Sequence, residues 1–509
     1  MRVTRKMMNS NSVYNINANK EHMDKLNTQM ATQKKFTDPS DDPITAIRAI
    51  RYRTDLSEVS QYLDRNVSDA VSWTENTQTA IDSARELMRS LKAEYTSASN
   101  GTNESKDQRI YYDNMENLVK EFYSIGNTST EDRYIFTGYR TTDSLTFTEK
   151  DFAERESAVV DGKFTYEGIK ESFKMEDIEN YSFTKNTDTS ASYGVTDNDI
   201  SSLSTSVDET KIQNVQAYRI RLSYKELDDI TPDEPGLSGL SRVYVDNDYE
   251  IPDPPADDTI YYNRDKGTLI FGEQVKATLA GILSTPAGAD GISFSYDKSS
   301  WKVGDVKPEY YFDCKETGLG AGNEITYDDH RQTMNYHMGD SQNTKVNTNA
   351  CDVFTLDARR DLDELHDALN LLDEARDKVS RLQGMQEDTI RYGDADREKI
   401  DYLLAAAEKE RNYAQQKVDD LLSHGITKAE KYFDMVNKAA TEMGTSIKRL
   451  ELIRNRLTAD KTTVATQTSN NENIDLSTLA VDSSEASLSY SAALQVTGKI
   501  GQQTLINFI

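Results

Sequence analysis

The sequence predicts an α + β fold in which the N- and C-terminal flanks form one long helical coiled-coil bundle and a mainly β domain is inserted between them. The first observation behind this prediction is the placement of proline, which is confined to turns, strand edges and first helical turns. Of nine prolines in 509 residues, Pro39 and Pro43 lie near the start and the other seven lie between Pro232 and Pro308. Both flanks can therefore form uninterrupted helices, and the centre cannot.

The second observation is an apolar spacing of three and four residues in both flanks, which places one side chain per turn on a single helix face. In the N-terminal flank this seam runs without a slip for about eleven turns, and we assign residues 41–147 to the N-terminal half of a helical block. Its polar members are interpreted as residues that fix register rather than bind a ligand. The seam positions are Tyr52, Leu56, Val59, Leu63, Asn66, Ala70, Trp73, Thr77, Ala80, Ala84, Leu87 and Leu91. A shorter helical run from Tyr111 to Ile125 ends at Gly126.

The start of the long helix is marked by the segment Asp38-Pro39-Ser40-Asp41-Asp42-Pro43. Its three carboxylates could form a cation site or an acid/base pair, but helix capping is the stronger interpretation. An oxygen from Ser40, Asp41 or Asp42 would accept the first free N–H groups, Pro43 fits the first turn, and negative charge suits a helix N-terminus.

The C-terminal flank mirrors the first and supplies the other half of the helical block, residues 351–468. We expect one helix over the leucine-rich run from Leu362 to Val379 and a second from Ile400 to Leu421. A break is predicted at Ser423-His424-Gly425, after which the pattern resumes and continues to about residue 465. Each flank has an apolar stripe to bury, and the economical solution is that they bury them against each other.

The third observation is the β-rich, acidic character of the insertion, residues 148–350. Residues 141–350 carry 19 of the 28 net negative charges. Strands rich in Tyr and β-branched residues are predicted at 182–184, 242–245, 259–263, 268–271 and 292–296. Asp265-Lys266-Gly267 is typical of a hairpin connection, and residues 211–228 are predicted to be helical.

The two ends of the chain are amphipathic, weakly apolar segments, residues 1–40 and 469–509. Isolated helices of this quality are marginal in water, so we expect both to be disordered in the monomer and ordered only in an assembly. The residues expected to be buried between subunits are Ile16, Met23, Leu26, Met30, Ala486, Ala493, Leu494, Ile500, Leu505 and Phe508.

Composition excludes several classes of protein. No stretch approaches the roughly 18 apolar residues of a membrane-spanning helix, and a net charge of −28 disfavours nucleic acid as a partner. The start of the chain has no apolar core of a cleaved secretion signal. Five His and two Cys are scattered without a metal-binding or nucleophile motif, so we expect no metal, no cofactor and no enzyme activity. Unpaired thiols are favoured over a single bridge between Cys314 and Cys351.

Short motifs at both ends resemble the bacterial flagellar hook-associated protein 3 family, the flagellin-related hook–filament junction proteins. In the N-terminal flank they are MRVTRKMM at the start, the Asp38–Pro43 segment, and Arg133-Tyr134-Ile135-Phe136-Thr137-Gly138-Tyr139. In the C-terminal flank they are residues 444–457, 471–476 and 492–500. The resemblance covers roughly residues 1–147 and 355–509, and the insertion matches nothing that can be assigned.

The resemblance implies a structural adaptor that joins the first hook-associated protein to the flagellin filament by packing of its terminal helices. It implies a ring of copies of the chain at the hook–filament junction, outside the cell. It further implies export through the flagellar type III apparatus without cleavage of a signal, and a cytoplasmic chaperone that binds the C-terminal region.

Two alternatives stay open. The chain could be a flagellin-type filament subunit, since such subunits also assemble by packing of paired terminal helices. It could also be a surface-binding, adhesin-like module in which the acidic, Tyr-rich insertion binds a glycan or another surface. An inserted hydrolase is disfavoured because the sequence lacks its motifs.

Overall fold

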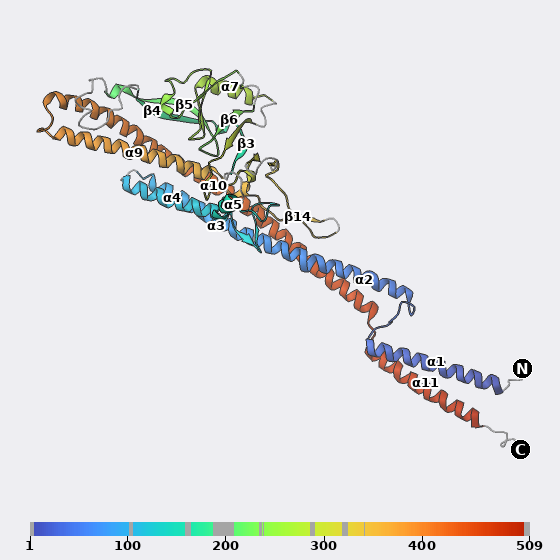
Figure 1. Cartoon of the computed structure of the whole chain (residues 1–509). Coiled ribbons are helices and arrows are strands. Elements are labelled where there is room, and N and C mark those ends of the chain that lie inside the picture. Colours follow the sequence, from blue (N-terminus) through green and yellow to red (C-terminus); the bar gives the residue numbers. More distant parts are fainter. Residues whose placement is uncertain are drawn as a thin grey trace, which may run out of the picture. The chain divides into compact units, whose positions relative to one another are not determined.

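The computed structural model describes residues 5–100, 105–157, 164–186, 208–233, 237, 239–285, 291–317, 324–339 and 342–502 (Figure 1). The chain divides into two compact units. The first unit contains residues 1–72, 336–344 and 447–509, and the second contains residues 73–335 and 345–446.

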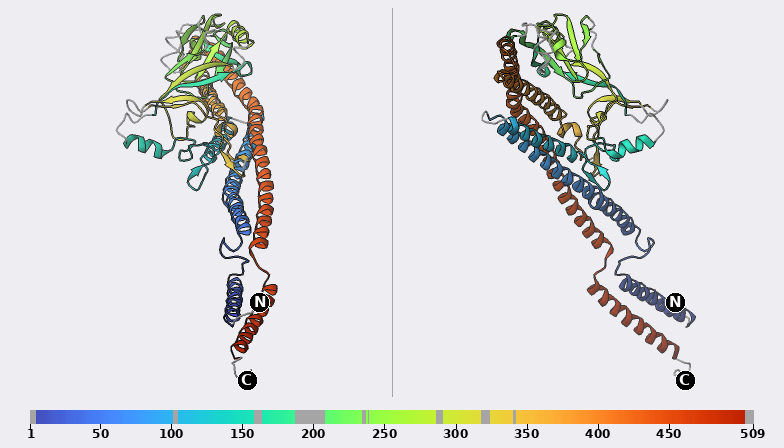
Figure 2. Two further views of the ribbon diagram at one scale, coloured as in Figure 1. Left: turned by 90° about the vertical axis from the view of Figure 1, so that its right-hand side faces the viewer. Right: turned by 60° about the vertical axis from the view of Figure 1, so that its left-hand side comes forward.

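The first unit is built from pairs of helices that come from opposite ends of the chain. Helices α1 (Arg5–Thr32) and α11 (Leu476–Gln502) lie side by side and antiparallel, as the views of Figures 1 and 2 agree. Helix α2 (Pro43–Gln61) lies along the last turns of α10 (Asp394–Glu472), where Asn471 Nδ2 donates to the Thr45 carbonyl oxygen at 3.1 Å. The prediction that the two flanks pack on each other is therefore confirmed in this unit.

A π-helical segment, η1 (Tyr62–Val67), follows α2 and corrects the predicted seam at Asn66, whereas the seam positions Ala70, Trp73 and Thr77 beyond it are buried as predicted. A π turn holds one residue more than an α turn, so it rotates the residues after it about the helix axis. Val67, rather than the predicted Asn66, is fully buried there. Asn66 instead donates from Nδ2 to the carbonyl oxygen of His337 at 2.7 Å.

The second unit contains a helical block formed by α3 (Ser68–Ala98, from Trp73 onward), α4 (Ser105–Ile125), α9 (Asp357–Glu387) and α10 as far as Ser446. Helices α9 and α10 form a hairpin, and α4 packs on α9 (Figure 1). The inward face of α3 has the predicted spacing of three and four residues. Its buried side chains include Trp73, Thr77, Ala80, Ile81, Ala84, Met88, Leu91, Tyr95 and Ala98.

Helix α10 runs for 79 residues without interruption, so the predicted break at Ser423-His424-Gly425 is wrong. Gly425 lies inside the helix, where a Cβ atom would come within 2.3 Å of the Tyr95 ring. The glycine is therefore explained by the close approach of an aromatic side chain rather than by a helix end.

Two five-stranded sheets form the β part of the second unit. The first has the order β12-β11-β3-β10-β6 and is entirely antiparallel, whereas the second has the order β4-β5-β9-β8-β7 with β7 and β8 parallel. The strands of the first sheet are β3 (Tyr166–Phe173), β6 (Asp229–Pro232), β10 (Ile292–Lys298), β11 (Asp313–Glu316) and β12 (Ile325–Tyr327). Those of the second are β4 (Glu179–Asn186), β5 (Ile212–Arg221), β7 (Ser241–Tyr244), β8 (Thr259–Asn263) and β9 (Thr268–Phe271). The predicted strands at 182–184, 242–245, 259–263, 268–271 and 292–296 are confirmed, and Gly267 turns the β8–β9 hairpin with φ +58°.

The described chain also has smaller elements. The α-helices are α5 (Glu149–Ser157), α7 (Glu273–Leu283) and α8 (Ala350–Val353). The 3-10 helices are η2 (Met175–Asp177), η3 (Glu209–Lys211), η5 (Asp248–Glu250) and η7 (Pro308–Tyr310). The strand pairs are β1 (Ser129–Thr130) with β2 (Arg133–Tyr134), and β13 (Asn335–His337) with β14 (Asn343–Lys345).

The prediction of a helix over residues 211–228 is wrong because most of this segment is strand β5. β5 is hydrogen-bonded to β4 on one side and to β9 on the other. Ile212, Val215, Ala217 and Ile220 are buried, and their spacing suits a strand covered on both faces better than a helix stripe. Pairing with distant strands therefore decided the structure of a locally ambiguous sequence.

Strand β5 is joined to the helical block by ion pairs within the second unit. Arg219 bonds Glu179 of β4 at 2.8 Å and Glu364 of α9 at 2.7 Å, and Arg221 bonds Asp361 of α9 at 2.6 Å. Burial alone would raise the pKa of Glu364, but Arg219 outweighs this effect and the pKa lies below its ordinary value. The insertion is thus held to the helices by paired charges that are largely removed from water.

Candidate assembly site

The pair α1 and α11 has a small apolar core. Leu26 is 5% exposed, Leu479 is fully buried, Ala486 is 7% exposed, and Ile474 packs against them. Three side chains of this size bury little apolar surface compared with the core of a globular domain, so the pair is weakly held.

The residues predicted to lie between subunits fall into four groups. Leu26 and Ala486 are buried inside the pair, and Ile16, Met23 and Ala493 are half-buried. Met30 is 44% exposed and Leu494 is 46% exposed. The Ile500 side chain, Leu505 and Phe508 lie outside the described residues. The domain limits, the disorder of the ends in the monomer and the burial of these residues between subunits stay predictions.

The first unit also exposes large apolar side chains that the sequence analysis did not single out. They occur on α1, on α2, on the last part of α10 and on α11. They are Met7, Met8, Val13, Tyr14, Ile44, Ile47, Ile50, Leu452, Leu476, Val481, Leu488 and Val496, each at least 43% exposed. The much larger second unit also exposes apolar side chains, among them Tyr139 and Ile390, but the first unit carries more of them on fewer residues. A high density of exposed apolar side chains is typical of a surface that binds protein. A helical-wheel plot of each segment, with the buried residues marked, would have identified these exposed apolar side chains.

The start of α2 is capped by Asp42. Its Oδ1 accepts from the backbone N–H groups of Ile44 and Thr45 at 3.2 Å, and Pro43 occupies the first helical turn. Hydrogen bonding from the Thr45 side chain holds the pKa of Asp42 below its usual value. Asp41 caps the preceding turn by accepting from the N–H groups of Thr37 and Asp38, which lower its pKa. Ser40 is exposed in the same turn.

Glu472, the last residue of α10, lies at the elbow of the first unit, where the pair α1 and α11 meets the pair α2 and α10. It binds residues from both sides of this elbow. Its carboxylate, only 5% exposed, accepts from Arg53 Nε at 2.6 Å, Arg53 Nη2 at 2.6 Å and Lys34 Nζ at 2.9 Å. The hydrogen bonds from Arg53 hold the pKa of Glu472 below its ordinary value. Its carbonyl oxygen accepts from Lys35 N at 2.7 Å, and Ile474 N donates to the Gln33 carbonyl oxygen at 3.2 Å. Sequence reasoning missed this residue because its partners lie more than 400 positions away.

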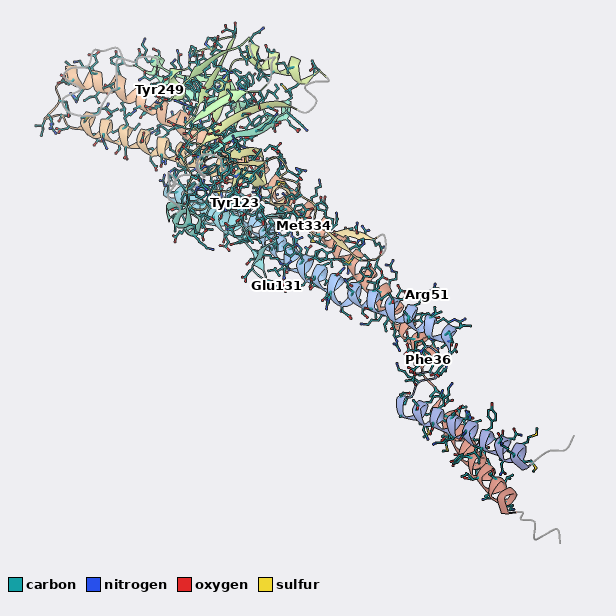
Figure 3. All side chains as sticks on the ribbon, turned by 45° about the vertical axis from the view of Figure 1, so that its right-hand side comes forward. Phe36, Arg51, Tyr123, Glu131, Tyr249 and Met334 are labelled. Atoms are coloured by element: carbon teal, nitrogen blue, oxygen red, sulfur yellow. The ribbon has the colours of Figure 1, made fainter. Side chains whose placement is uncertain are left out.

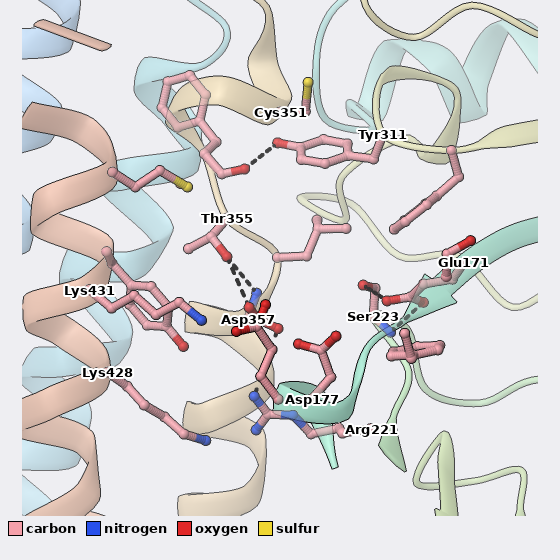
Figure 4. A pocket seen from close by; sticks show the side chains of 18 of the residues that line it. Glu171, Asp177, Arg221, Ser223, Tyr311, Cys351, Thr355, Asp357, Lys428 and Lys431 are labelled. Atoms are coloured by element: carbon pink, nitrogen blue, oxygen red, sulfur yellow. Dashed lines mark hydrogen bonds and ion pairs between the residues drawn. The ribbon is translucent and has the colours of Figure 1, made fainter. Parts of the chain in front are cut away.

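A polar pocket of about 360 Å³ lies in the second unit, where sheet residues face α9 and α10 (Figure 4). Its charged residues largely pair with one another. Asp357 lies 3.8 Å from Arg221, and Lys428 binds Glu179 at 3.3 Å. Burial raises the pKa of Glu171 to about 7, although the Ser223 and Tyr296 side chains donate to its carboxylate. We interpret the pocket as the polar margin of the contact that Arg219 and Arg221 make with α9.

Both cysteines are free thiols in the structure. Burial raises the pKa of Cys351 to about 11 and raises that of Cys314 further, so neither thiol is activated as a nucleophile. None of the helices in the described ranges is long and apolar enough to cross a membrane.

Comparison with known proteins places the N-terminal flank in a class. Residues 3–141 match the family model of the bacterial flagellin N-terminal helical region, so the first helices of this chain are of the flagellin type. Within that class, the chain is similar to flagellar hook-associated protein 3. Over 148 residues it is 32% identical to the proteins of that name from Salmonella typhimurium and from Escherichia coli K12.

The similarity to these relatives is partial. The aligned segment is 28% of this chain and 44% of either relative, so the chain spans less than half the length of the curated relatives it matches. Two solved structures resemble the fold loosely. They are a putative flagellar hook-associated protein from Vibrio parahaemolyticus (TM-score 0.34, 9% identity, 85% of this chain and 100% of that one) and FlgL from Xanthomonas campestris (TM-score 0.27, 11% identity, 82% and 99%). At such scores neither structure carries a conclusion about this chain.

Proposed function

We propose that this chain is a structural adaptor at the junction between hook and filament of a bacterial flagellum. The observation that carries the proposal is the match of residues 3–141 to the flagellin N-terminal region together with 32% identity to hook-associated protein 3. In this proposal the chain packs as a ring of copies, bound by the first hook-associated protein on one side and by flagellin on the other. It performs no catalysis.

The chemistry of such an adaptor is the burial of apolar surface between subunits. The exposed apolar side chains of α1, α2 and α11 supply that surface, and the weak core of α1 and α11 leaves these helices free to adapt to neighbours. Packing in the ring then offsets the loss of conformational freedom of the terminal helices. The lone chain does not gain this stabilisation, so its terminal helices stay weakly held until it packs against neighbours.

The location and route follow from the same proposal. The chain would act outside the cell, exported through the flagellar type III apparatus without a cleaved signal and held until then by a chaperone on its C-terminal region. The insertion would face outward and could vary without loss of the junction.

Deletion of the gene in the source organism tests the proposal directly. Electron microscopy should show hooks without filaments, and flagellin should accumulate as monomer in the culture medium. Filaments of normal length on the deletion strain would overturn the adaptor function and favour the surface-binding alternative.

Substitutions on the proposed packing surface test whether that surface is needed for filament assembly. Met30→Asp combined with Leu494→Asp should leave circular dichroism of the purified chain unchanged, because both side chains are nearly half exposed, and should abolish filament assembly on complementation. The control is Ile390→Asp, since Ile390 is 98% exposed in the second unit and should tolerate the charge. Normal filaments with the double variant would show that these positions do not face a neighbour.

A further inference from the structure

Two helices of the first unit present exposed faces of opposite charge. On α2, Ile44, Ile47, Arg48 and Arg51 follow one another at spacings of three, one and three residues, so they share one face. The buried face of α2, with Ala46 and Ala49, lies on the other side of the helix. Ile44 and Ile47 are 65% and 60% exposed, and both arginines are exposed; Arg51 is labelled in Figure 3.

Helix α11 presents the complementary arrangement. Val481, Glu485 and Leu488 stand at i, i+4 and i+7 and share one face, with Asp482 beside it. Val481 is 57% exposed and Leu488 is 71% exposed, and both carboxylates are exposed. Leu479 and Ala486, which pack toward α1, occupy the opposite side of the helix.

The two faces match in length, in apolar content and in charge. Each extends over eight residues, or about 10 Å along its helix at 1.5 Å per residue. Each has two apolar side chains, and the two arginines on one correspond to Glu485 on the other face and to Asp482, which lies at the margin of that face toward Ala486. Among the described residues these four charged groups have no ion pair within 4 Å and no side-chain hydrogen bond, although Arg48 acts electrostatically on Asp42 and helps to lower its pKa.

We infer that the Ile44–Arg51 face of α2 binds the Val481–Leu488 face of α11 in a second copy of the chain. The inference rests on the proposed self-assembly and names one contact within it. In this contact the apolar side chains bury one another while Arg48 and Arg51 face Asp482 and Glu485.

The contact is heterologous, because each copy contributes a different face. Every copy therefore keeps a free α2 face and a free α11 face after binding one neighbour, and the assembly can continue into a ring or a helical array. The charges determine which faces meet, because two α2 faces or two α11 faces would place like charges together.

Site-directed thiol cross-linking tests the pairing in the full-length chain. In a background with Cys314→Ser and Cys351→Ser, one protein carries Ile47→Cys and another carries Leu488→Cys. Oxidation of the mixture should give a dimer that joins the two proteins, in excess of the dimers formed by either alone. The control mixes Leu488→Cys with Ile390→Cys, since Ile390 is 98% exposed in the second unit, outside the exposed apolar surface of the first. Equal cross-linking at position 390 would overturn the pairing.

Charge reversal provides an independent test by sedimentation of the same full-length chain. Arg48→Glu with Arg51→Glu should weaken self-association by about tenfold or more, because two attractions become repulsions. Asp482→Lys with Glu485→Lys should do the same, and a mixture of the two variants should regain association. Arg454→Glu, at an exposed position on α10, should have little effect.

The outcomes separate this inference from the proposed function. Unchanged self-association of both reversed variants would overturn the pairing while leaving the adaptor function intact. Absence of self-association in the unaltered chain, together with normal filaments in the deletion strain, would overturn both.

Discussion

The two compact units of this chain differ most in charge. Residues 1–72, 336–344 and 447–509 contain 17 Lys and Arg against 16 Asp and Glu, which leaves the second unit with 42 basic and 71 acidic residues of the chain's 59 and 87. The first unit is therefore near neutral and the second carries a net charge of −29. A nearly neutral surface with exposed apolar side chains favours association, whereas a strongly charged one keeps copies apart and soluble.

The units also differ in what they bury. The second unit has a broad aromatic core, in which Phe354 lies 5.0 Å from Phe122 and 4.9 Å from Phe136 between ring centroids. The helix pair α1 and α11 of the first unit has only three buried apolar side chains in its core. The comparison indicates that the second unit is stable by itself and that the terminal helices depend on neighbours for part of their stability.

The largest expected effect concerns the aromatic core. Phe354→Ala should lower the free energy of unfolding of the second unit by about 3–5 kcal/mol, because a large ring is removed from a packed site. Leu479→Ala should lower that of the terminal helix pair by about 2 kcal/mol. Calorimetry of each variant should show two transitions that shift separately. A single transition that both substitutions shift equally would contradict the division into independent units.

The packing of α10 on α3 gives the next effect. Gly425→Ala should destabilise the second unit by about 1–3 kcal/mol, because the added methyl would meet Tyr95 at 2.3 Å. Gly444 lies in the same helix with no atom within 4 Å of the added methyl, so Gly444→Ala should stabilise by up to about 1 kcal/mol. Urea unfolding followed by circular dichroism would measure both. Similar changes in the free energy of unfolding for the two substitutions would show that the Tyr95 side chain moves aside at little cost.

The buried carboxyl groups of the second unit predict a dependence on pH. Burial raises the pKa of Glu309 to about 7, and Arg140 at 3.5 Å does not offset it. The folded state therefore retains this proton at a pH where the unfolded chain has lost it. The stabilisation is complete below pH 4.5 and is lost as pH rises through 7, a change on the order of 3 kcal/mol.

Unfolding of the second unit at a series of pH values tests this expectation. Glu309→Gln should flatten the fall in stability between pH 5 and pH 8, since an amide does not titrate. Glu171, whose pKa is also raised to about 7 by burial, should add a second contribution of the same sign. A rise in stability over this range would mean that both carboxylates are better solvated than the structure indicates.

The smallest effect is expected at the cap of α2 in the first unit. Asp42→Ala removes the acceptor for two N–H groups and should lower the melting temperature of this unit by a few degrees. Asp38→Ala changes the charge equally but removes no such acceptor, and it serves as the control. Equal shifts in melting temperature for the two variants would show that the effect comes from the lost charge rather than from the lost cap.

Much of this architecture follows from local sequence. The absence of proline and the apolar spacing predict the helices of the flanks, and β8 and β9 have the predicted limits because their β-branched and Tyr-rich runs are flanked by turn residues. The errors have a common cause. Residues 211–228 and Gly425 depend on partners far away in the sequence, namely β4 with β9 and Tyr95. The local propensities of a segment do not reveal such distant pairings.

The candidate site shows the same limit. The Asp38–Pro43 segment predicts a capped helix start from adjacent residues alone. Glu472 was missed because its role depends on ion pairs with Arg53 and Lys34, which are distant in the sequence. Equally, apolar spacing on α1 and α11 does not distinguish a side chain buried against the other helix, such as Leu26, from one turned outward, such as Leu494.

The elbow around Glu472 has a mechanical consequence. Ten residues, 33–42, join α1 to α2, but only three, 473–475, join α10 to α11. The short connection fixes the distance between the two helix pairs, while the longer one provides slack on the other side. Torque applied to the terminal helices would therefore turn them about residues 473–475 as a pivot, with the ion pairs of Glu472 acting as the stop that limits the turn.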